Sequence, residues 1–285
     1  MSESSTAPPV GRPAADAAPE PPAPRPAQPP APPAGQPEPA ERPRMFPPGV
    51  GPAADPTEGT APDRAIRSFQ PRRSRVTDSQ RQALLRLWSR WGLEIDGRTR
   101  LDLTALFDGR PVVLEIGFGM GEASAEMAAA DPDTGLLAAD VHTPGQGNLL
   151  RLAERAGLTN VRVANGDAIL LLREMLPERS LAGLRIFFPD PWPKKRHHKR
   201  RLIQPAFVAL AASRLAPGAT LHCATDWVPY ADWMLEVLSG SELLANTAAD
   251  GGFVPRPAGR PLTRFERQGL AKGHEVRDLV FRRLP

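Results

Sequence analysis

Cysteine is nearly absent from this sequence, which has a single one, Cys223, among its 285 residues. One cysteine excludes a disulfide framework and a zinc cluster built from cysteines. Cys223 lies among apolar residues of a predicted strand, so we expect a core thiol rather than a nucleophile. We predict no metal site, because the histidines are scattered along the chain; they are His142, His197, His198, His222 and His274.

Long hydrophobic runs are absent as well. No apolar stretch approaches the ~18 residues of a membrane span, and the opening MSESSTAPPV lacks the basic and apolar segments of a secretory signal. We therefore expect a soluble, cytoplasmic protein without a membrane partner, either a monomer or a homodimer.

Lysine is scarce: the chain has four, and three of them lie between residues 194 and 201. This run, KKRHHKRR, carries six formal positive charges and no acid. Such density favours a polyanionic partner, with a solvated basic loop as the alternative. A second group of basic residues lies upstream and comprises Arg64, Arg67, Arg72, Arg73 and Arg75.

Bulky apolar residues are rare in the first 64 residues, which hold 20 of the 35 prolines. Such a segment cannot bury enough apolar surface to offset the entropy lost on ordering. We predict a disordered Pro/Ala-rich tail over residues 1–64. The remaining residues, 65–285, are enough for one domain with a sizeable core.

Within that domain, short apolar runs alternate with helical patterns. A first helix follows the capping-box sequence at Thr77–Gln80 and ends at Gly92. Strands are predicted at residues 112–116, 136–140, 161–163, 184–188, 220–225 and 275–282. Helices are predicted between them, ending near residue 130 and spanning 146–156, 168–175, 203–215 and 228–238. This alternation predicts an α/β fold with a mostly parallel sheet covered on both faces.

Acidic residues mark the carboxyl ends of the five strands that we expect to be parallel. They are Glu115, Asp140, Asp167, Asp190 and Asp226. In open α/β sheets, ligands bind at this edge, where the strand order reverses. Five converging carboxylates would be costly unless they face a polar or cationic ligand.

A glycine-rich loop, Gly117 to Gly121, follows the first of these strands. Its G-x-G-x-G spacing puts Glu122 where a dinucleotide fingerprint has glycine or alanine. Glu115 and Glu122 would also repel a pyrophosphate. S-adenosylmethionine fits better because it carries an ammonium and a sulfonium cation and no phosphate. Its amino-acid part would then lie near Glu115, its ribose near Asp140 and its adenine near Asp167.

The segment Phe187–Lys195 places Asp190 between two prolines, with Trp192 beside it and the basic run directly after. Proline restricts its own φ and the preceding residue, so Asp190 is held in an extended conformation. A rigid carboxylate, an indole that can stack on a base and phosphate-binding cations are typical of a nucleic-acid site. The alternative is a surface loop with Trp192 packed on the protein body.

Five blocks of this sequence resemble, in order, those of the bacterial tRNA (guanine-N7-)-methyltransferase family. They are VLEIGFG at 113–119, VHTPG at 141–145, FPDPWPK at 188–194, ATD at 224–226 and TRFE at 263–266. The resemblance runs from about residue 65 to the C-terminus and includes Arg67-Ser68-Phe69 and Gly273-His274. It implies a Rossmann-like class I methyltransferase fold, with a mostly parallel seven-stranded sheet, an antiparallel C-terminal strand and helices on both faces. It also implies methyl transfer from S-adenosylmethionine to N7 of a guanosine in the tRNA variable loop.

The resemblance assigns roles to individual positions. Cofactor-binding positions are Glu115, Gly117, Gly119, Asp140, Asp167 and Asp190, and Asp190 is also the catalytic position. Substrate-binding positions are Lys194, Asp226, Thr263, Arg264, Phe265 and Glu266. RNA-binding positions are Arg196, His197, His198, Lys199, Arg200 and Arg201. The family usually has glutamate where this chain has Asp140, whose side chain is one methylene shorter.

Three other interpretations remain open from the residues. A small-molecule methyltransferase of the same fold would explain the five acids but not the basic run. A non-catalytic RNA-binding protein would not need an intact glycine loop, and a nicotinamide oxidoreductase conflicts with the loop spacing and charge. Thr263 and Glu266 are equally compatible with an ordinary helix N-cap and its capping-box partner.

Overall fold

The computed structural model describes residues 75–271 and 273–285, apart from the side chains of Arg264 and Phe265. The predicted tail at 1–64, the upstream arginines before Arg75 and the Arg67-Ser68-Phe69 block therefore lie outside the described residues. Among the residues described, no helix is long and apolar enough to cross a membrane.

The described residues form one eight-stranded sheet with the order β1-β4-β3-β2-β5-β6-β8-β7. The strands are β1 (Gly92–Glu94), β2 (Val112–Ile116), β3 (Gly135–Asp140), β4 (Val161–Asn165), β5 (Leu181–Phe187), β6 (Leu215–Thr225), β7 (Leu244–Asn246) and β8 (Arg277–Arg283). Strands β1 to β6 pair in parallel, whereas β8 is antiparallel to both β6 and β7. The predicted fold class is thus confirmed, with eight strands in place of seven.

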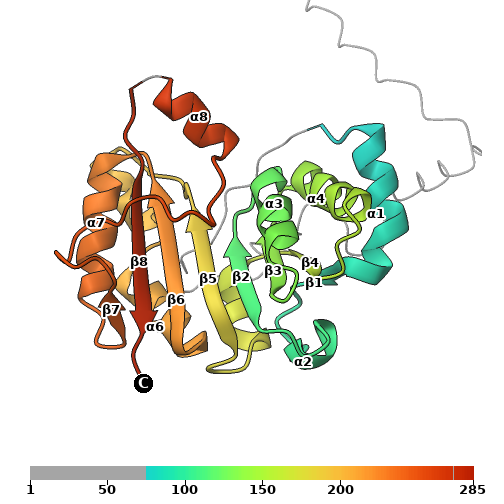
Figure 1. Ribbon diagram of the computed structural model, residues 1–285, viewed down its shortest axis with the longest axis horizontal. Helices are drawn as coiled ribbons and strands as arrows, with labels where there is room; N and C mark the ends of the chain where they lie inside the picture. Colours follow the sequence, from blue (N-terminus) through green and yellow to red (C-terminus); the bar gives the residue numbers. More distant parts are fainter. Residues whose placement is uncertain (1–74, 272) are drawn as a thin grey trace, which may run out of the picture. The chain divides into compact units, whose positions relative to one another are not determined.

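Helices cover the sheet on both faces (Figure 1). They are α1 (Asp78–Trp91), α2 (Leu103–Leu106), α3 (Glu122–Ala130), α4 (Thr143–Arg155), α5 (Ala168–Leu170), α6 (Pro205–Arg214), α7 (Val228–Ser239) and α8 (Arg264–Leu270). A π-helical turn, η1 (Leu171–Met175), continues α5, and a 3₁₀-helix, η2 (Lys195–Arg200), lies within the basic run.

The buried apolar side chains form two clusters, one on each face of the sheet. One contains side chains of α1, α3 and α4 against β3 and β4, including Trp88, Leu149 and Val163. The other contains α6 and α7 against the opposite side of the central strands, including Leu114 and Cys223. Alternate residues of the central strands point into different clusters, as the period of two in a strand requires.

Several predicted boundaries shift in the structure. The strand expected at 220–225 begins at Leu215, because β6 includes an irregular stretch with Pro217 and Gly218, and the helix expected at 203–215 ends at Arg214. The short strands β1 and β7 were not predicted, since three residues are too few to show an alternating pattern. The capping box at Thr77 and Gln80 is confirmed by both reciprocal hydrogen bonds.

Candidate functional site

The five predicted acids lie at one edge of the sheet. Strands β4, β3, β2, β5 and β6 are adjacent and parallel, so their carboxyl ends meet there. Between β2 and β5 the chain order reverses, since β3 and β4 extend to one side and β6 to the other. This is the point at which open α/β sheets bind ligands. Glu115 lies in β2 and Asp190 follows β5, so these two acids flank the reversal.

The glycine loop takes a backbone conformation that side chains disfavour. Gly117, Gly119 and Gly121 have φ angles of 79°, 61° and 78°. No atom lies within 4 Å of a Cβ built on Gly117 or Gly119, so open space borders the loop at these two positions. On its other side the loop is tightly packed: a Cβ on Gly145 would lie 1.7 Å from the carbonyl oxygen of Gly119.

Glu115 is a buried carboxyl group, 3% exposed. Its Oε1 accepts a hydrogen bond of 3.0 Å from Ser124 Oγ on α3, while Oε2 has no partner among the residues described. Burial raises the pKa of Glu115 to about 7, although Arg185 and the Ser124 hydroxyl oppose the shift. A buried acceptor without a donor is costly, and a bound cationic group would remove that cost.

Asp140, the last residue of β3, is hydrogen-bonded through both carboxylate oxygens. Oδ2 accepts from the amide of Gly119 and Oδ1 from the amide of His142, each at 3.0 Å. Burial raises the pKa of Asp140, and the backbone donors partly offset this. The short side chain thus joins the tip of β3 to the glycine loop, and the remaining lone pairs of its oxygens are the acceptors available to a ribose.

A chain of buried polar groups behind Asp140 was missed by the sequence analysis. Gln146 Nε2 donates to the Asp140 carbonyl oxygen at 2.7 Å and to Asn165 Oδ1 at 2.9 Å. Asn165 Nδ2 in turn donates to Glu94 Oε2 at 3.0 Å. Burial raises the pKa of Glu94 to about 7. The only signal in the sequence was a polar residue ending an apolar strand, Asn165.

The third acid, Asp167, caps a helix. Its Oδ1 accepts from the amide of Ile169 at 2.9 Å and so forms the N-cap of α5. One carboxylate oxygen therefore has a local structural task, as is common in turns that lead from a strand to a helix.

The segment around Asp190 carries backbone strain on both sides. Phe188 has a φ of 52° and Trp192 a φ of 44°, values that cost non-glycine residues about 1–3 kcal/mol each. Contacts hold both residues in place. The Phe188 amide donates to the Ala224 carbonyl at 2.8 Å, and the Arg200 guanidinium lies 5.0 Å from the centre of the Trp192 ring. Trp192 also meets His197 edge-on, so the indole is partly packed on its own basic loop.

Most of the basic run is accessible. Lys194, Arg196 and Lys199 are exposed; Arg196 and Lys199 lie in η2, which has no buried residue, and Lys194 directly precedes it. The prediction for Arg201 needs correction, because its side chain is 2% exposed and packs on Tyr230. In this structure a phosphate cannot reach it.

Asp226 lies just beyond β6 and remains partly exposed. Its Oδ2 is 3.0 Å from His274 Nδ1. A Cβ on Gly269 would lie 3.1 Å from the same oxygen, which places α8 directly beside it. Figure 1 shows α8 at the edge of the sheet where the parallel strands end. The structure therefore brings the 263–266 segment to the same edge as the acids.

Thr263 and Glu266 form the N-terminal capping box of α8, which confirms the second of the two interpretations given for them. The Glu266 carboxylate is 3% exposed and receives two hydrogen bonds from Arg260, at 2.6 and 3.0 Å. The predicted substrate contact through Glu266 is corrected accordingly: its carboxylate holds α8 in place and is not presented to a ligand. The side chains of Arg264 and Phe265 lie outside the described residues.

Arg260 links this segment to the sheet. Its Nε and Nη2 donate to the two oxygens of Asp278 at 2.7 Å each, and His222 Nε2 lies 2.7 Å from Asp278 Oδ1. Burial would raise the pKa of Asp278, but its hydrogen bonds to His222 and Arg260 outweigh burial and hold it below the usual range.

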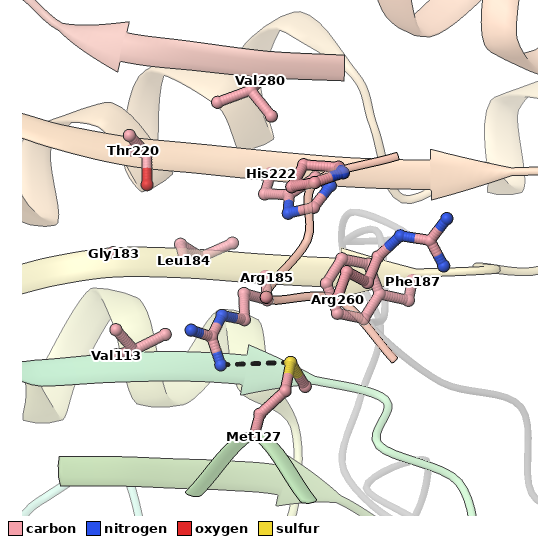
Figure 2. Close-up of a pocket in the computed structure, with 12 residues that line it drawn as sticks. Val113, Met127, Gly183, Leu184, Arg185, Phe187, Thr220, His222, Arg260 and Val280 are labelled. Atoms are coloured by element: carbon pink, nitrogen blue, oxygen red, sulfur yellow. Dashed lines mark hydrogen bonds between the residues drawn. The ribbon is translucent and has the colours of Figure 1, made fainter. Parts of the chain in front are cut away.

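A cavity of about 230 Å³ lies beside this network. Figure 2 shows Arg185, His222 and Arg260 around it, with Arg185 Nη1 3.4 Å from the Met127 sulfur. Most of its lining residues lie in β2, β5, β6 and β8, while Met127 belongs to α3 and Arg260 to the segment before α8. None of the five acids lines it. The cavity is therefore distinct from the edge where the acids lie.

The residues at the strand edge fit S-adenosylmethionine. An orphaned buried Glu115 oxygen suits a cation, and the open side of Gly117 and Gly119 lets a ligand approach the backbone. Cys223 is fully buried, and burial raises its pKa to about 12, so its thiol takes no part. Within residues 75–271 and 273–285, no three His, Cys, Asp or Glu side chains are grouped to hold a metal ion.

Comparisons with known proteins agree with this site. Residues 109–279 match the model of a family described as putative methyltransferases. A tRNA (guanine-N(7)-)-methyltransferase of Streptomyces coelicolor is 71% identical over 235 residues, covering 82% of this chain and 86% of that protein. One of Halorhodospira halophila is 54% identical over 224 residues, covering 78% and 96%. The chain therefore belongs to the tRNA (guanine-N(7)-)-methyltransferase family and is an enzyme whose methyl donor is S-adenosylmethionine.

Proposed function

We propose that this enzyme methylates N7 of a guanosine in the variable loop of tRNA, in the cytoplasm. One observation carries the proposal: the buried Glu115, four partly buried acids and an open glycine loop share a sheet edge with an exposed basic helix. The acids suit a cationic donor, and the basic helix suits a phosphate backbone. A small-molecule methyltransferase would have no use for the second feature.

For the cofactor, we assign Glu115 to the cationic amino-acid part, Asp140 to the ribose and Asp167 to the adenine edge. Gly117 and Gly119 provide the close backbone approach. When bound, S-adenosylmethionine supplies an electrophilic methyl group on a positively charged sulfur.

The reaction needs no general base, because guanine N7 has an in-plane lone pair and no proton to lose. What remains for the protein is alignment of N7 with the methyl group and stabilisation of positive charge as it develops on the purine. We assign both tasks to Asp190, which the flanking prolines and strained residues hold in one conformation. Asp226 would hold the guanine or its sugar from the neighbouring strand tip.

The basic helix would grip the tRNA without reading its sequence. Lys194, Arg196 and Lys199 are exposed and able to contact phosphates. Each phosphate contact that is lost should lower the salt dependence of binding.

The decisive experiment incubates the enzyme with radiolabelled S-adenosylmethionine and bulk tRNA that lacks this modification, followed by nucleoside analysis. The expected product is 7-methylguanosine, mapped to the variable loop. Label in another nucleoside, or in no RNA product at all, would overturn the proposal.

A further inference from the structure

Arg201 is a buried cation with no acid to balance it. Among the residues described, no carboxylate lies within ion-pair distance of its guanidinium, and Nη2 has no hydrogen-bond partner. An unpaired buried charge is unfavourable. We therefore expect the Arg201 guanidinium to have a function that offsets the free-energy cost of burying its charge.

The contacts that Arg201 does make lead to the Asp190 segment. Its Nε donates to the carbonyl oxygen of Pro191 at 3.0 Å, and its guanidinium lies 4.8 Å from the centre of the Tyr230 ring. Tyr230 is fully buried in α7, and its hydroxyl accepts a hydrogen bond from the amide of Ile203 at 3.2 Å. Arg201 thus joins the residue next to Asp190 to a rigid helix.

The Asp190 segment needs such support. Its strained residues, Phe188 and Trp192, persist only where surrounding contacts hold them. Pro191 has no amide hydrogen, so its carbonyl is the only backbone group through which hydrogen bonding can hold it. Arg201 Nε donates to that carbonyl.

We propose that Arg201 is a positioning residue, which holds the Pro189-Asp190-Pro191 segment in the conformation needed for methyl transfer. It acts through Pro191 and has no contact with RNA. This inference rests on the proposed function, because it gives Asp190 the role assigned above.

The test compares Arg201→Gln with Arg196→Gln, which removes an exposed charge of the same run, and with Arg155→Gln, an exposed arginine on α4. Arg201→Gln should lower kcat at least tenfold. Its KM for tRNA and the salt slope of its tRNA binding should both stay within twofold of the values for the Arg155→Gln control. Arg196→Gln should raise the KM and flatten the salt slope. If Arg201→Gln instead behaves like Arg196→Gln, or keeps normal kcat, the proposal fails.

A second measurement does not depend on activity. Hydrogen exchange of the peptide covering residues 186–194 should become faster in Arg201→Gln and stay normal in Arg196→Gln. Arg201→Lys keeps the charge but loses the planar fork, so it should show the same faster exchange as Arg201→Gln; normal exchange in both variants contradicts the proposal. Far-UV circular dichroism spectra that match that of the wild type show that the variants are folded. Failure of wild-type enzyme to methylate tRNA would instead count against the proposed function.

Discussion

The amide of Gly119 donates a hydrogen bond to Asp140 Oδ2 across 3.0 Å, which fixes the middle of the glycine loop to the tip of β3. The same carboxylate also accepts from the amide of His142. One side chain therefore fixes the loop relative to the start of α4, against which the loop packs tightly.

Asp140→Asn should weaken S-adenosylmethionine binding about tenfold, because an amide has one acceptor and would turn its own donor toward a backbone N–H. Calorimetric titration of the apo enzyme measures the change. Asp131→Asn, at an exposed position after α3, is the matched control and should bind normally. Normal binding by Asp140→Asn would remove this carboxylate from the cofactor site.

Binding of S-adenosylmethionine should depend on pH through Glu115. With a pKa of about 7, the carboxyl is mostly protonated at pH 6 and mostly ionised at pH 7.5. A cationic ligand prefers the ionised form, so affinity should rise roughly tenfold over this range. Glu115→Gln should bind weakly with a flat profile, whereas Glu94→Gln should retain the slope. An equal slope in Glu115→Gln would show that another group titrates.

The raised pKa values also make the stability of the fold depend on pH. Stability should fall as the pH rises, whereas cofactor affinity should increase. The folded pKa values of Glu94 and Glu115 are raised to about 7, so between pH 4.5 and 7 the folded state holds protons that the unfolded state has released. Their contribution to the free energy of unfolding is present at low pH and is lost as pH rises through 7. Denaturant titrations should show this decline reduced in Glu94→Gln; an unreduced decline contradicts the raised pKa.

Asp190→Asn should reduce kcat by roughly a hundredfold or more, because a neutral amide cannot stabilise positive charge developing on the purine. The loss of cofactor affinity should be far smaller. Single-turnover methylation of tRNA and a cofactor titration measure the two effects separately. Near-normal turnover would remove Asp190 from the mechanism.

Gly145→Ala should displace the glycine loop, since its Cβ would lie 1.7 Å from Gly119 O. We expect cofactor affinity to fall by roughly a hundredfold, because a displaced loop backbone would lose about two hydrogen bonds to the cofactor. Gly157→Ala is the control: φ is 65° there and no atom lies within 4 Å, so it introduces strain alone. It should cost about 1 kcal/mol of stability and leave binding intact. Equal binding losses in both variants would mean that the close contact is irrelevant.

Arg260→Met should destabilise the fold by about 3–5 kcal/mol, because it removes the guanidinium that pairs with the buried carboxylates of both Glu266 and Asp278. Thermal and denaturant unfolding measure the loss. The control is Arg256→Met, which removes a half-exposed partner 4.0 Å from Glu266 and should cost less than about 1 kcal/mol. Similar losses in the two variants would contradict a dominant role for Arg260.

The sequence by itself determined the fold class, the succession of the main strands and helices along the chain, and the edge at which the acids meet. Periodicity of apolar residues is a local property, and parallel strands must end on one side. The positions of the glycine loop and the five acids at the carboxyl ends of the strands follow from these two properties.

Only the tertiary structure decided which charged groups are buried and paired and which are exposed. Arg201 and Arg200 are neighbours in one basic run, yet one packs on Tyr230 and the other on Trp192. Glu266 was predicted to contact the substrate, but its buried carboxylate accepts two hydrogen bonds from Arg260. Burial and pairing depend on residues distant in the chain, so composition and spacing cannot reveal them. The polar chain from Glu94 through Asn165 and Gln146 to Asp140 crosses three strands and a helix for the same reason.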